Sequence, residues 1–314
     1  MNIRLRGVRG SSPTPLTPEA VQSKIAAAIQ RVKPSDLVSP ESRELFLSRL
    51  PEYIFGTTGG NTACIEVRLC EESLVILDCG TGLRELERSL RKRKDKVKTF
   101  HIFFSHFHYD HILGLPYFGM MYDPEVTVHF YSPYPKMEEI LRNFMVAPYH
   151  PVTFDSFNAK CNFHLLKGNR LDLPGGKIFW IKRNHPNGSF AYKIEQNDRS
   201  FIYSSDTELR QEDFNRSKKN IKFFERADAL VLDAQYTLGE AFEKYDWGHS
   251  SYSMAVDFAI EFGISELYLF HHEPLYDDKK MSSIQRSARW YTHRSKGKPE
   301  VNVQLAVEGL NIEL

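Results

Sequence analysis

Cysteine is scarce in this sequence, whose 314 residues contain four, at Cys64, Cys70, Cys79 and Cys161. Their positions show no paired metal-binding spacing, and a disulfide scaffold is not expected in so large a chain. The sequence therefore gives no support for a cysteine-based metal site or a disulfide framework. This cysteine usage favours a reducing compartment.

Long hydrophobic runs are also missing. No apolar stretch approaches the roughly 18 residues that a membrane-spanning helix needs. Residues 1–6 alternate like a strand and lack the long apolar core of a signal peptide. We therefore expect a soluble, cytoplasmic protein with no membrane partner.

An excess of charge of one sign is absent as well. The chain has 41 Lys and Arg against 40 Asp and Glu, a formal net charge of +1. A nucleic-acid-binding surface that extends over a whole chain usually shows as a strong basic excess, so this composition disfavours one. The basic run at residues 91–98 follows a predicted helix. We interpret it as a solvated helix end, with a local phosphate-binding segment as the alternative.

Histidine, in contrast, is concentrated directly after residues 100–104. This apolar, aromatic run predicts a buried strand. His106 and His108 are two positions apart, and in an extended segment such side chains point the same way, so both can hold one metal ion. Asp110 and His111 lie past the turn and can face a second ion. Imidazole nitrogen with carboxylate oxygen suits zinc, with manganese or iron as alternatives. A turn satisfied by hydrogen bonds explains such a cluster poorly.

Three further candidate ligands stand at the ends of other apolar strands. His185 lies in a loop after the strand-like residues 177–181, Asp206 ends another apolar run, and His271 directly follows residues 267–270. A rim shared by several strand ends can collect such side chains. The sequence thus offers enough groups for a two-metal centre.

The pattern His-x-His-x-Asp-His after a hydrophobic strand resembles the metal signature of the metallo-β-lactamase superfamily. Four more segments resemble its phosphodiesterase branch, which includes ribonuclease Z and cyclic-nucleotide or cyclic-phosphate phosphodiesterases: residues 6–15, 59–62, 77–82 and 270–274. The resemblance spans nearly the whole chain. It implies an α/β fold, a four-layer αββα sandwich formed by residues 1–314 as a single domain, with a helical insertion at about residues 16–55.

The same resemblance implies a centre of two divalent metal ions, zinc being expected and Mn²⁺ or Fe²⁺ the alternatives. The implied ligands are His106, His108 and His185 for the first ion, Asp110, His111 and His271 for the second, and Asp206 as the bridge. Asp78 is expected to support the metal-binding loops without binding metal. His272, next to His271, is expected to support the site or contact substrate.

The candidate catalytic groups are Asp110, His249 and Asp233. Relatives of the ribonuclease Z type carry a histidine in a context comparable to residues 248–250, where it contacts the scissile phosphate. His249 is therefore the candidate for transition-state stabilisation or leaving-group protonation, with capping of the helix predicted at residues 252–262 as the alternative. Asp233 either orients His249 or only binds a loop. Asp110 is expected to hold or accept a proton from the nucleophile.

Three other segments carry open interpretations. The helical insertion, which begins with cap signals at Thr17 and Ser39, is expected to pack on the sheet edge; the alternatives are a cover over the active site or a homodimer contact. The glycine- and serine-rich turn at residues 10–12 either faces an anion or simply ends a strand. The aromatic residues between 117 and 157 form either ordinary core or a wall on which a base stacks, with Phe144 and Tyr149 the first to test.

The remaining histidines lack a motif context and are expected to be structural or at the surface: His101, His129, His150, His164 and His293.

The sequence therefore predicts a binuclear-metal phosphodiesterase that hydrolyses a small cyclic nucleotide or cyclic phosphate by attack of a metal-bound hydroxide. The alternative function is a ribonuclease Z-like or other nuclease, which would act on RNA or DNA. A third interpretation is a nucleotide-binding protein on an inactive hydrolase scaffold, which the complete ligand set disfavours.

Overall fold

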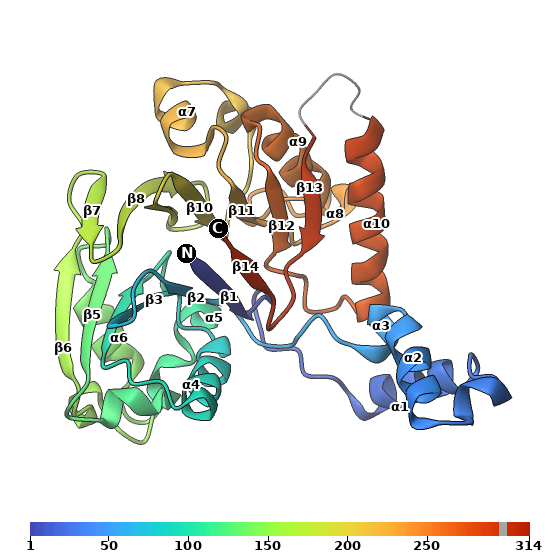
Figure 1. Cartoon of the computed structure of the whole chain (residues 1–314). Coiled ribbons are helices and arrows are strands. Elements are labelled where there is room, and N and C mark those ends of the chain that lie inside the picture. Colours follow the sequence, from blue (N-terminus) through green and yellow to red (C-terminus); the bar gives the residue numbers. More distant parts are fainter. Residues whose placement is uncertain (295–299) are drawn as a thin grey trace.

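The computed structural model describes residues 1–294 and 300–314, and two seven-stranded sheets form its centre (Figure 1). The first sheet has the order β14 (Asn311–Glu313), β1 (Asn2–Gly7), β2 (Cys64–Arg68), β3 (Ser73–Leu77), β4 (Thr99–Phe103), β5 (Thr127–Ser132) and β6 (Lys160–Leu165). The second has the order β13 (Asn302–Leu305), β12 (Glu266–Phe270), β11 (Ala229–Asp233), β10 (Arg199–Ser204), β9 (Ser189–Gln196), β8 (Gly176–Arg183) and β7 (Arg170–Leu173).

Helices cover the outer face of each sheet. Those on the first sheet are α4 (Gly82–Arg93), α5 (Tyr109–Ile112) and α6 (Met137–Phe144). Those on the second are α7 (Lys218–Phe224), α9 (Tyr252–Phe262) and α10 (Asp278–Arg294), and the short helix α8 (Leu238–Glu243) contacts α9. This arrangement confirms the predicted αββα sandwich. No helix in the described residues is long and apolar enough to cross a membrane.

The alternation of side chains along β4 shows how the layers form. Phe100 and Ile102 pack against the helices, whereas Phe103 packs between the two sheets. Successive residues of a strand point to opposite faces, so a strand buried on both sides reads as a continuous apolar run.

Parallel pairing places the ends of several strands at one rim. β3, β4 and β5 run parallel to one another, as do β10, β11 and β12. Asp78 and His106 follow β3 and β4, and Asp206 and His271 follow β10 and β12, while Asp233 ends β11. Because the carboxyl ends of parallel strands share one edge, the fold gathers these side chains as the sequence predicts.

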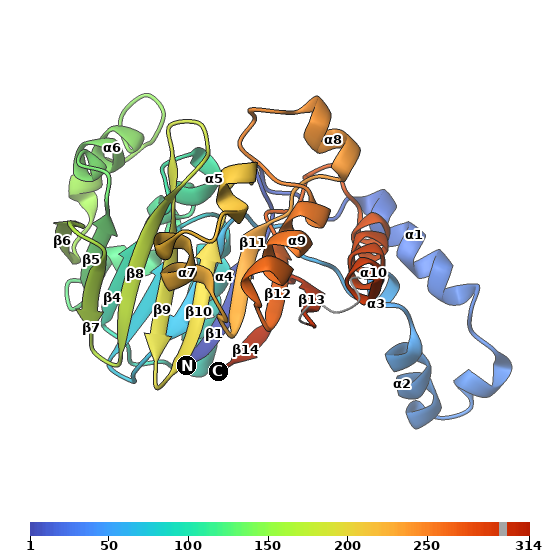
Figure 2. The ribbon, with the colours of Figure 1, turned by 90° about the horizontal axis from the view of Figure 1, so that it is seen from above.

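The segment between β1 and β2 forms the helices α1 (Pro18–Ile29), α2 (Pro40–Arg49) and α3 (Glu52–Phe55). Thr17 and Ser39 cap α1 and α2 as their positions predict. α1 and α2 lie beyond α10, and the ion pair between Lys24 and Asp278, 2.7 Å long, ties α1 to the start of α10 (Figure 2).

The apolar residues of α1 recur at helical spacing but do not form a buried face. Val21, Ile25 and Ile29 are 42%, 55% and 65% exposed, and no residue of α1 is fully buried. Regular apolar spacing predicts a helix but cannot say whether another element lies against it.

Two arginines of the basic run at the end of α4 form ion pairs with acidic neighbours. Arg91 pairs with Glu87 at 2.6 Å, and Arg93 pairs with Glu66 at 2.9 Å. These pairs favour the interpretation as a solvated helix end over a phosphate-binding segment.

Candidate metal centre

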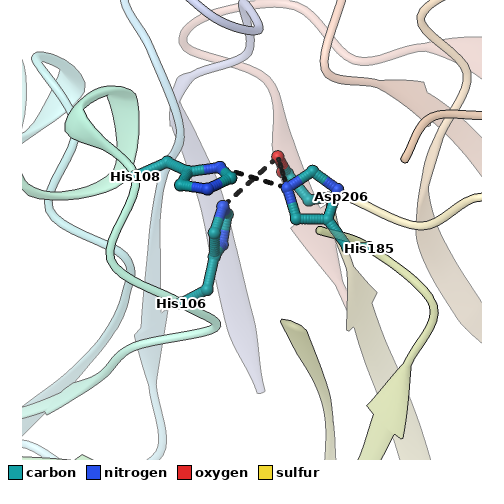
Figure 3. A group of neighbouring side chains, drawn as sticks. All are labelled: His106, His108, His185 and Asp206. Carbon is teal, nitrogen blue, oxygen red and sulfur yellow. Dashed lines mark hydrogen bonds and ion pairs between the residues drawn. The ribbon is translucent and has the colours of Figure 1, made fainter. Parts of the chain in front are cut away.

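The rim brings all seven predicted ligands into two adjacent groups. In the first, one nitrogen or oxygen atom from each residue lies within 4.8 Å of the others (Figure 3): His106, His108, His185 and Asp206. The second group meets the same limit: Asp110, His111, Asp206 and His271. Asp206 belongs to both groups, as the bridging role implied by the resemblance requires.

Backbone conformation aims three of the rim's side chains. Asp78, Asp206 and His271 have φ angles of 59°, 46° and 59°. Asp78 and His271 directly follow β3 and β12, and Asp206 lies two residues after the end of β10. This left-handed conformation turns the chain sharply and costs roughly 1 to 3 kcal/mol for a residue other than glycine. Such strain persists only where the surrounding structure enforces it, and it is common at functional sites.

Two glycines let the backbone approach the imidazoles closely. A Cβ atom at Gly10 would lie 2.5 Å from Nδ1 of His271. One at Gly248, whose φ is +90°, would lie 2.3 Å from Nδ1 of His185. Either distance is too short for a side chain, so these positions require glycine to leave room for the two rings.

Asp78 orients His111. Its Oδ2 lies 2.7 Å from Nδ1 of His111, and it also accepts hydrogen bonds from Tyr203 Oη at 2.7 Å and Ser105 Oγ at 2.6 Å. A carboxylate that takes the Nδ1–H leaves the lone pair of Nε2 free to bind a metal. Asp78 thus occupies the supporting position predicted from the resemblance.

Neutral oxygens orient two more rings. Nδ1 of His185 lies 2.9 Å from the carbonyl oxygen of Gly248, and Nδ1 of His271 lies 3.1 Å from Oε1 of Gln235. With Nδ1–H donating outward, Nε2 of both rings faces the centre. His108 differs, since its Nδ1 lies 3.1 Å from Nε2 of His185, so Nδ1 is the atom it presents.

The donor atoms fit a divalent metal. Nε2 of His106 and of His111 are buried without a hydrogen-bond partner among the described residues, although Nε2 of His111 lies only 3.0 Å from Oδ1 of Asp206. An unpaired buried polar atom is costly unless something such as an ion satisfies it. Imidazole nitrogens with carboxylate oxygens are a set that zinc, manganese and iron accept.

The charges of the centre favour a cation there. Burial by itself raises the pKa of Asp110 and of Asp206, but the nearby imidazoles, His111 first, lower both values well below the ordinary range. Burial lowers the pKa of His111, yet the carboxylates around it, Asp206 first, raise it well above its usual value. Two ionised carboxylates in a buried site attract positive charge, which a divalent ion supplies in place of a proton.

His249 and Asp233 form a pair beside the second group. Nδ1 of His249 lies 2.7 Å from Oδ2 of Asp233, and its ring stacks on that of His271 with centroids 4.8 Å apart. Burial lowers the pKa of His249, but the charge of Asp233 and its hydrogen bond outweigh burial and raise the value to about 9. His249 can therefore carry a proton at neutral pH.

The structure also bears on the alternative roles considered for these two residues, which are helix capping by His249 and loop binding by Asp233. Ser251, rather than His249, caps α9 by accepting a hydrogen bond from the N–H of Met254. Asp233 orients His249 and at the same time accepts from the backbone N–H of Ser250.

A cavity of about 1010 Å³ opens in front of both groups. Its polar side includes Ser11, Asp110, Asp206, His249 and His271. His249 thus shares one space with the candidate metal ligands, so a substrate held at the centre meets it.

Comparison with known proteins now gives the family. The family described as Beta-lactamase superfamily domain matches residues 74–272. This chain belongs to the metallo-β-lactamase superfamily. It is a metal-dependent hydrolase.

Three relatives illustrate the extent of this similarity. Ribonuclease Z from Synechococcus sp. is 22% identical over 275 residues, which cover 70% of this chain and 83% of the relative. The metallo-β-lactamase fold protein YhfI from Bacillus subtilis aligns over 100% of this chain and 98% of its own, with a TM-score of 0.65 and 16% identity. Zn(2+)-bound PqqB from Methylobacterium extorquens aligns over 100% of both chains, with a TM-score of 0.64 and 13% identity.

Two site residues of this superfamily member were missed or only half identified from the sequence. Gln235, two positions after β11, was given no role, because an amide that accepts one hydrogen bond leaves no motif. Ser11 lies in the turn that, from the sequence, either faces an anion or simply ends a strand, and its backbone N–H donates to Oδ2 of Asp110 at 2.8 Å. The anion that this turn faces is thus a side chain of the protein.

The neighbouring histidines 271 and 272 occupy different environments. His271 belongs to the second group, whereas Nε2 of buried His272 lies 2.8 Å from the carbonyl oxygen of Ala306. This geometry favours His271 as the ligand and His272 as structural support.

Proposed function

We propose that this hydrolase cleaves a phosphodiester with two divalent metal ions, zinc first among them. The observation that carries the proposal is the pair of ligand groups sharing Asp206, with the His249–Asp233 pair in the same cavity. When bound, the two ions would supply Lewis acidity, activating water and neutralising phosphoryl charge. Four-coordinate zinc accepts such mixed imidazole and carboxylate ligands.

The roles of the ligands follow from the atoms that they present. Nε2 of His106, Nδ1 of His108 and Nε2 of His185 would hold one ion. The second ion would be held by Asp110, His111 and His271. Asp206 would bridge, because two neighbouring cations repel each other and a shared anionic ligand reduces that repulsion.

The proton transfers are assigned to residues of this chain. Asp110, whose Oδ2 receives the N–H of Ser11, is placed to hold or accept a proton from the attacking water. His249, protonated with the support of Asp233, would donate a proton to the departing oxygen. General acid catalysis of this kind contributes roughly 10² to 10⁴-fold to the rate.

The relatives favour RNA as the first substrate class to test. The Synechococcus relative, which matches most of this chain, is named for ribonuclease activity. We propose cleavage of an RNA phosphodiester on that basis.

The cavity itself favours a second candidate, a small cyclic nucleotide or related cyclic phosphate. Its described lining residues include no lysine or arginine. Polynucleotide binding depends on basic side chains that neutralise several phosphates, whereas a cyclic phosphodiester carries one charge that the metal centre can meet.

The test combines metal analysis with a substrate panel of precursor tRNA, cyclic AMP, cyclic GMP and nucleoside 2′,3′-cyclic phosphates. We expect two metal equivalents and turnover of at least one member. His249→Ala should slow that turnover by roughly 10²-fold or more. His293→Ala, a change at an exposed histidine of α10, serves as the matched control. Full activity of His249→Ala would refute its role, and no turnover of any phosphodiester would refute the function.

A further inference from the structure

The cavity in front of the metal centre has two unlike sides. One carries the candidate ligands and His249, and the opposite side is formed by apolar and aromatic residues of α5, α6 and the segments that follow them. Such a division suits a substrate that is charged at one end and flat and apolar at the other.

Several rings on the second side are exposed to an unusual degree. Tyr109, Tyr117 and Tyr149 are 74%, 65% and 86% exposed, and all three line the cavity. The ring of Phe144 lies 6.1 Å from that of Tyr109, centroid to centroid, with the planes tilted by 36°. Aromatic rings left exposed along one cavity form a surface that a bound ligand can cover.

Tyr109 stands at the junction of the two sides. It lies between the candidate ligands His108 and Asp110 in the sequence and is the first residue of α5. Consecutive Cα atoms are about 3.8 Å apart, so this ring starts within a few ångströms of the ligands. A group joined to a phosphodiester by one sugar would reach it.

The chemistry of the lining indicates which group this is. The described lining residues offer rings together with a few hydrogen-bonding groups, such as those of Asn143 and His150, and no lysine or arginine that would pair with a second phosphate. A nucleobase is flat, uncharged and edged with hydrogen-bonding atoms, and it stacks on aromatic side chains with little dependence on sequence.

We propose that Tyr109 and Phe144, extended by Tyr117 and Tyr149, form a nucleobase-binding subsite beside the metal centre. The substrate is then a nucleoside phosphodiester, in which the base stacks on these rings while the phosphodiester meets the metal ions. This inference rests on the proposed function and adds the substrate class. It applies equally to a cyclic nucleotide and to a nucleotide at the cleavage point of RNA.

Equilibrium binding tests the subsite without turnover. The metal-loaded protein is titrated in a calorimeter with AMP and with ribose 5-phosphate, which lacks the base. Because base–aromatic stacking strengthens binding by about 10-fold or more, we expect a dissociation constant for AMP at least roughly 10-fold lower than that for ribose 5-phosphate. Tyr109→Leu and Phe144→Leu should bring the ratio of the two constants toward one, and Tyr109→Phe should restore it.

Phe55→Leu is the matched control, because this ring is 60% exposed but lies in α3, outside the cavity. It should keep the wild-type ratio, and circular dichroism melts should confirm that every variant is folded. Equal affinity for the two ligands in the wild type, no binding of either, or an unchanged ratio in both leucine variants would overturn the subsite. Absence of turnover across the substrate panel would instead overturn the phosphodiesterase proposal while leaving this ratio measurable.

Discussion

Two groups of histidines on the first sheet differ in what surrounds them. At the rim, His106, His108 and His111 follow β4 and face carboxylates of both sheets. Within the sheet, His101, His129 and His164 stand on β4, β5 and β6, where His101 is buried and the other two are half-buried. The same residue type on the same strand thus occurs in two settings only a few residues apart.

These inner histidines form hydrogen bonds with a histidine or a tyrosine of a neighbouring strand. Nδ1 of His129 lies 2.9 Å from Nε2 of His164, and Nδ1 of His101 lies 3.1 Å from the hydroxyl of Tyr131. Within the described ranges, 1–294 and 300–314, no carboxylate forms an ion pair with any of the three. Burial lowers the pKa of His101 to about 4, and the neighbouring histidines add to this effect.

The comparison teaches that clustering of imidazoles does not by itself make a metal centre. At the rim, carboxylates lie beside the imidazoles and favour positive charge there. Nε2 of His106 and of His111 have no hydrogen-bond partner among the described residues. Within the sheet, each of the three rings has a hydrogen-bond partner in a histidine or a tyrosine. Carboxylates and a position at strand ends decide which group can bind a cation.

Removal of the carboxylate of Asp206, which both ligand groups share, should have the largest effect on metal binding and turnover. Asp206→Ala takes a ligand from both groups and leaves the five rim imidazoles with one fewer counter-charge. We expect loss of at least one of two metal equivalents and a fall in turnover of more than roughly 10²-fold, since even supporting residues of metal sites cost 10 to 100-fold. Metal analysis and steady-state kinetics measure both, with exposed Asp172→Ala as the control. Retention of two ions would show that Asp206 does not bridge.

A smaller effect is expected at Gln235, which holds a rim imidazole without adding charge. Gln235→Leu removes the acceptor for Nδ1 of His271, so the ring can rotate or change tautomer. Metal affinity should fall by about 10 to 100-fold, and Gln235→Glu, which keeps an oxygen, should recover most of it. Competition with a chelating dye gives the affinities, and Gln30→Leu at an exposed position is the control. An unchanged affinity in Gln235→Leu would mean that His271 is oriented by other contacts.

Much of the rim could be predicted from the sequence. His185, Asp206 and His271 each follow an apolar run, and parallel pairing brings such ends together whatever the loops do. The helix at residues 252–262 was predicted with the bounds that it has, because caps and apolar spacing are local signals.

Other features depend on packing that no local pattern encodes. Phe118 and Phe130 are buried in the core, while Tyr117 and Tyr149 of the same aromatic stretch are exposed in the cavity. The supporting role of Gln235 arises only when β11 and β12 lie side by side. Sequence could place these residues near the site but could not separate core from cavity wall.

The smallest predicted effect concerns the inner histidines and appears only in acid. The pKa of His101 is about 4 in the folded protein and about 6.5 when unfolded, so between these values the unfolded chain binds more protons. Stability contributed by this group is therefore present above pH 6.5 and is lost as the pH falls toward 4. A shift of this size corresponds to about 2 to 3 kcal/mol of unfolding free energy.

Replacing the inner imidazole with an uncharged ring should remove that acid sensitivity. In His101→Phe, the loss of unfolding free energy between pH 7 and pH 4 should be about 2 to 3 kcal/mol smaller than in the wild type, as measured by urea denaturation. His293→Phe, at an exposed position, should behave like the wild type. Metal content at pH 7 should stay unchanged, because His101 belongs to neither ligand group. A drop in bound metal would show that the interior and rim histidines form one coupled system, and would break the contrast between them.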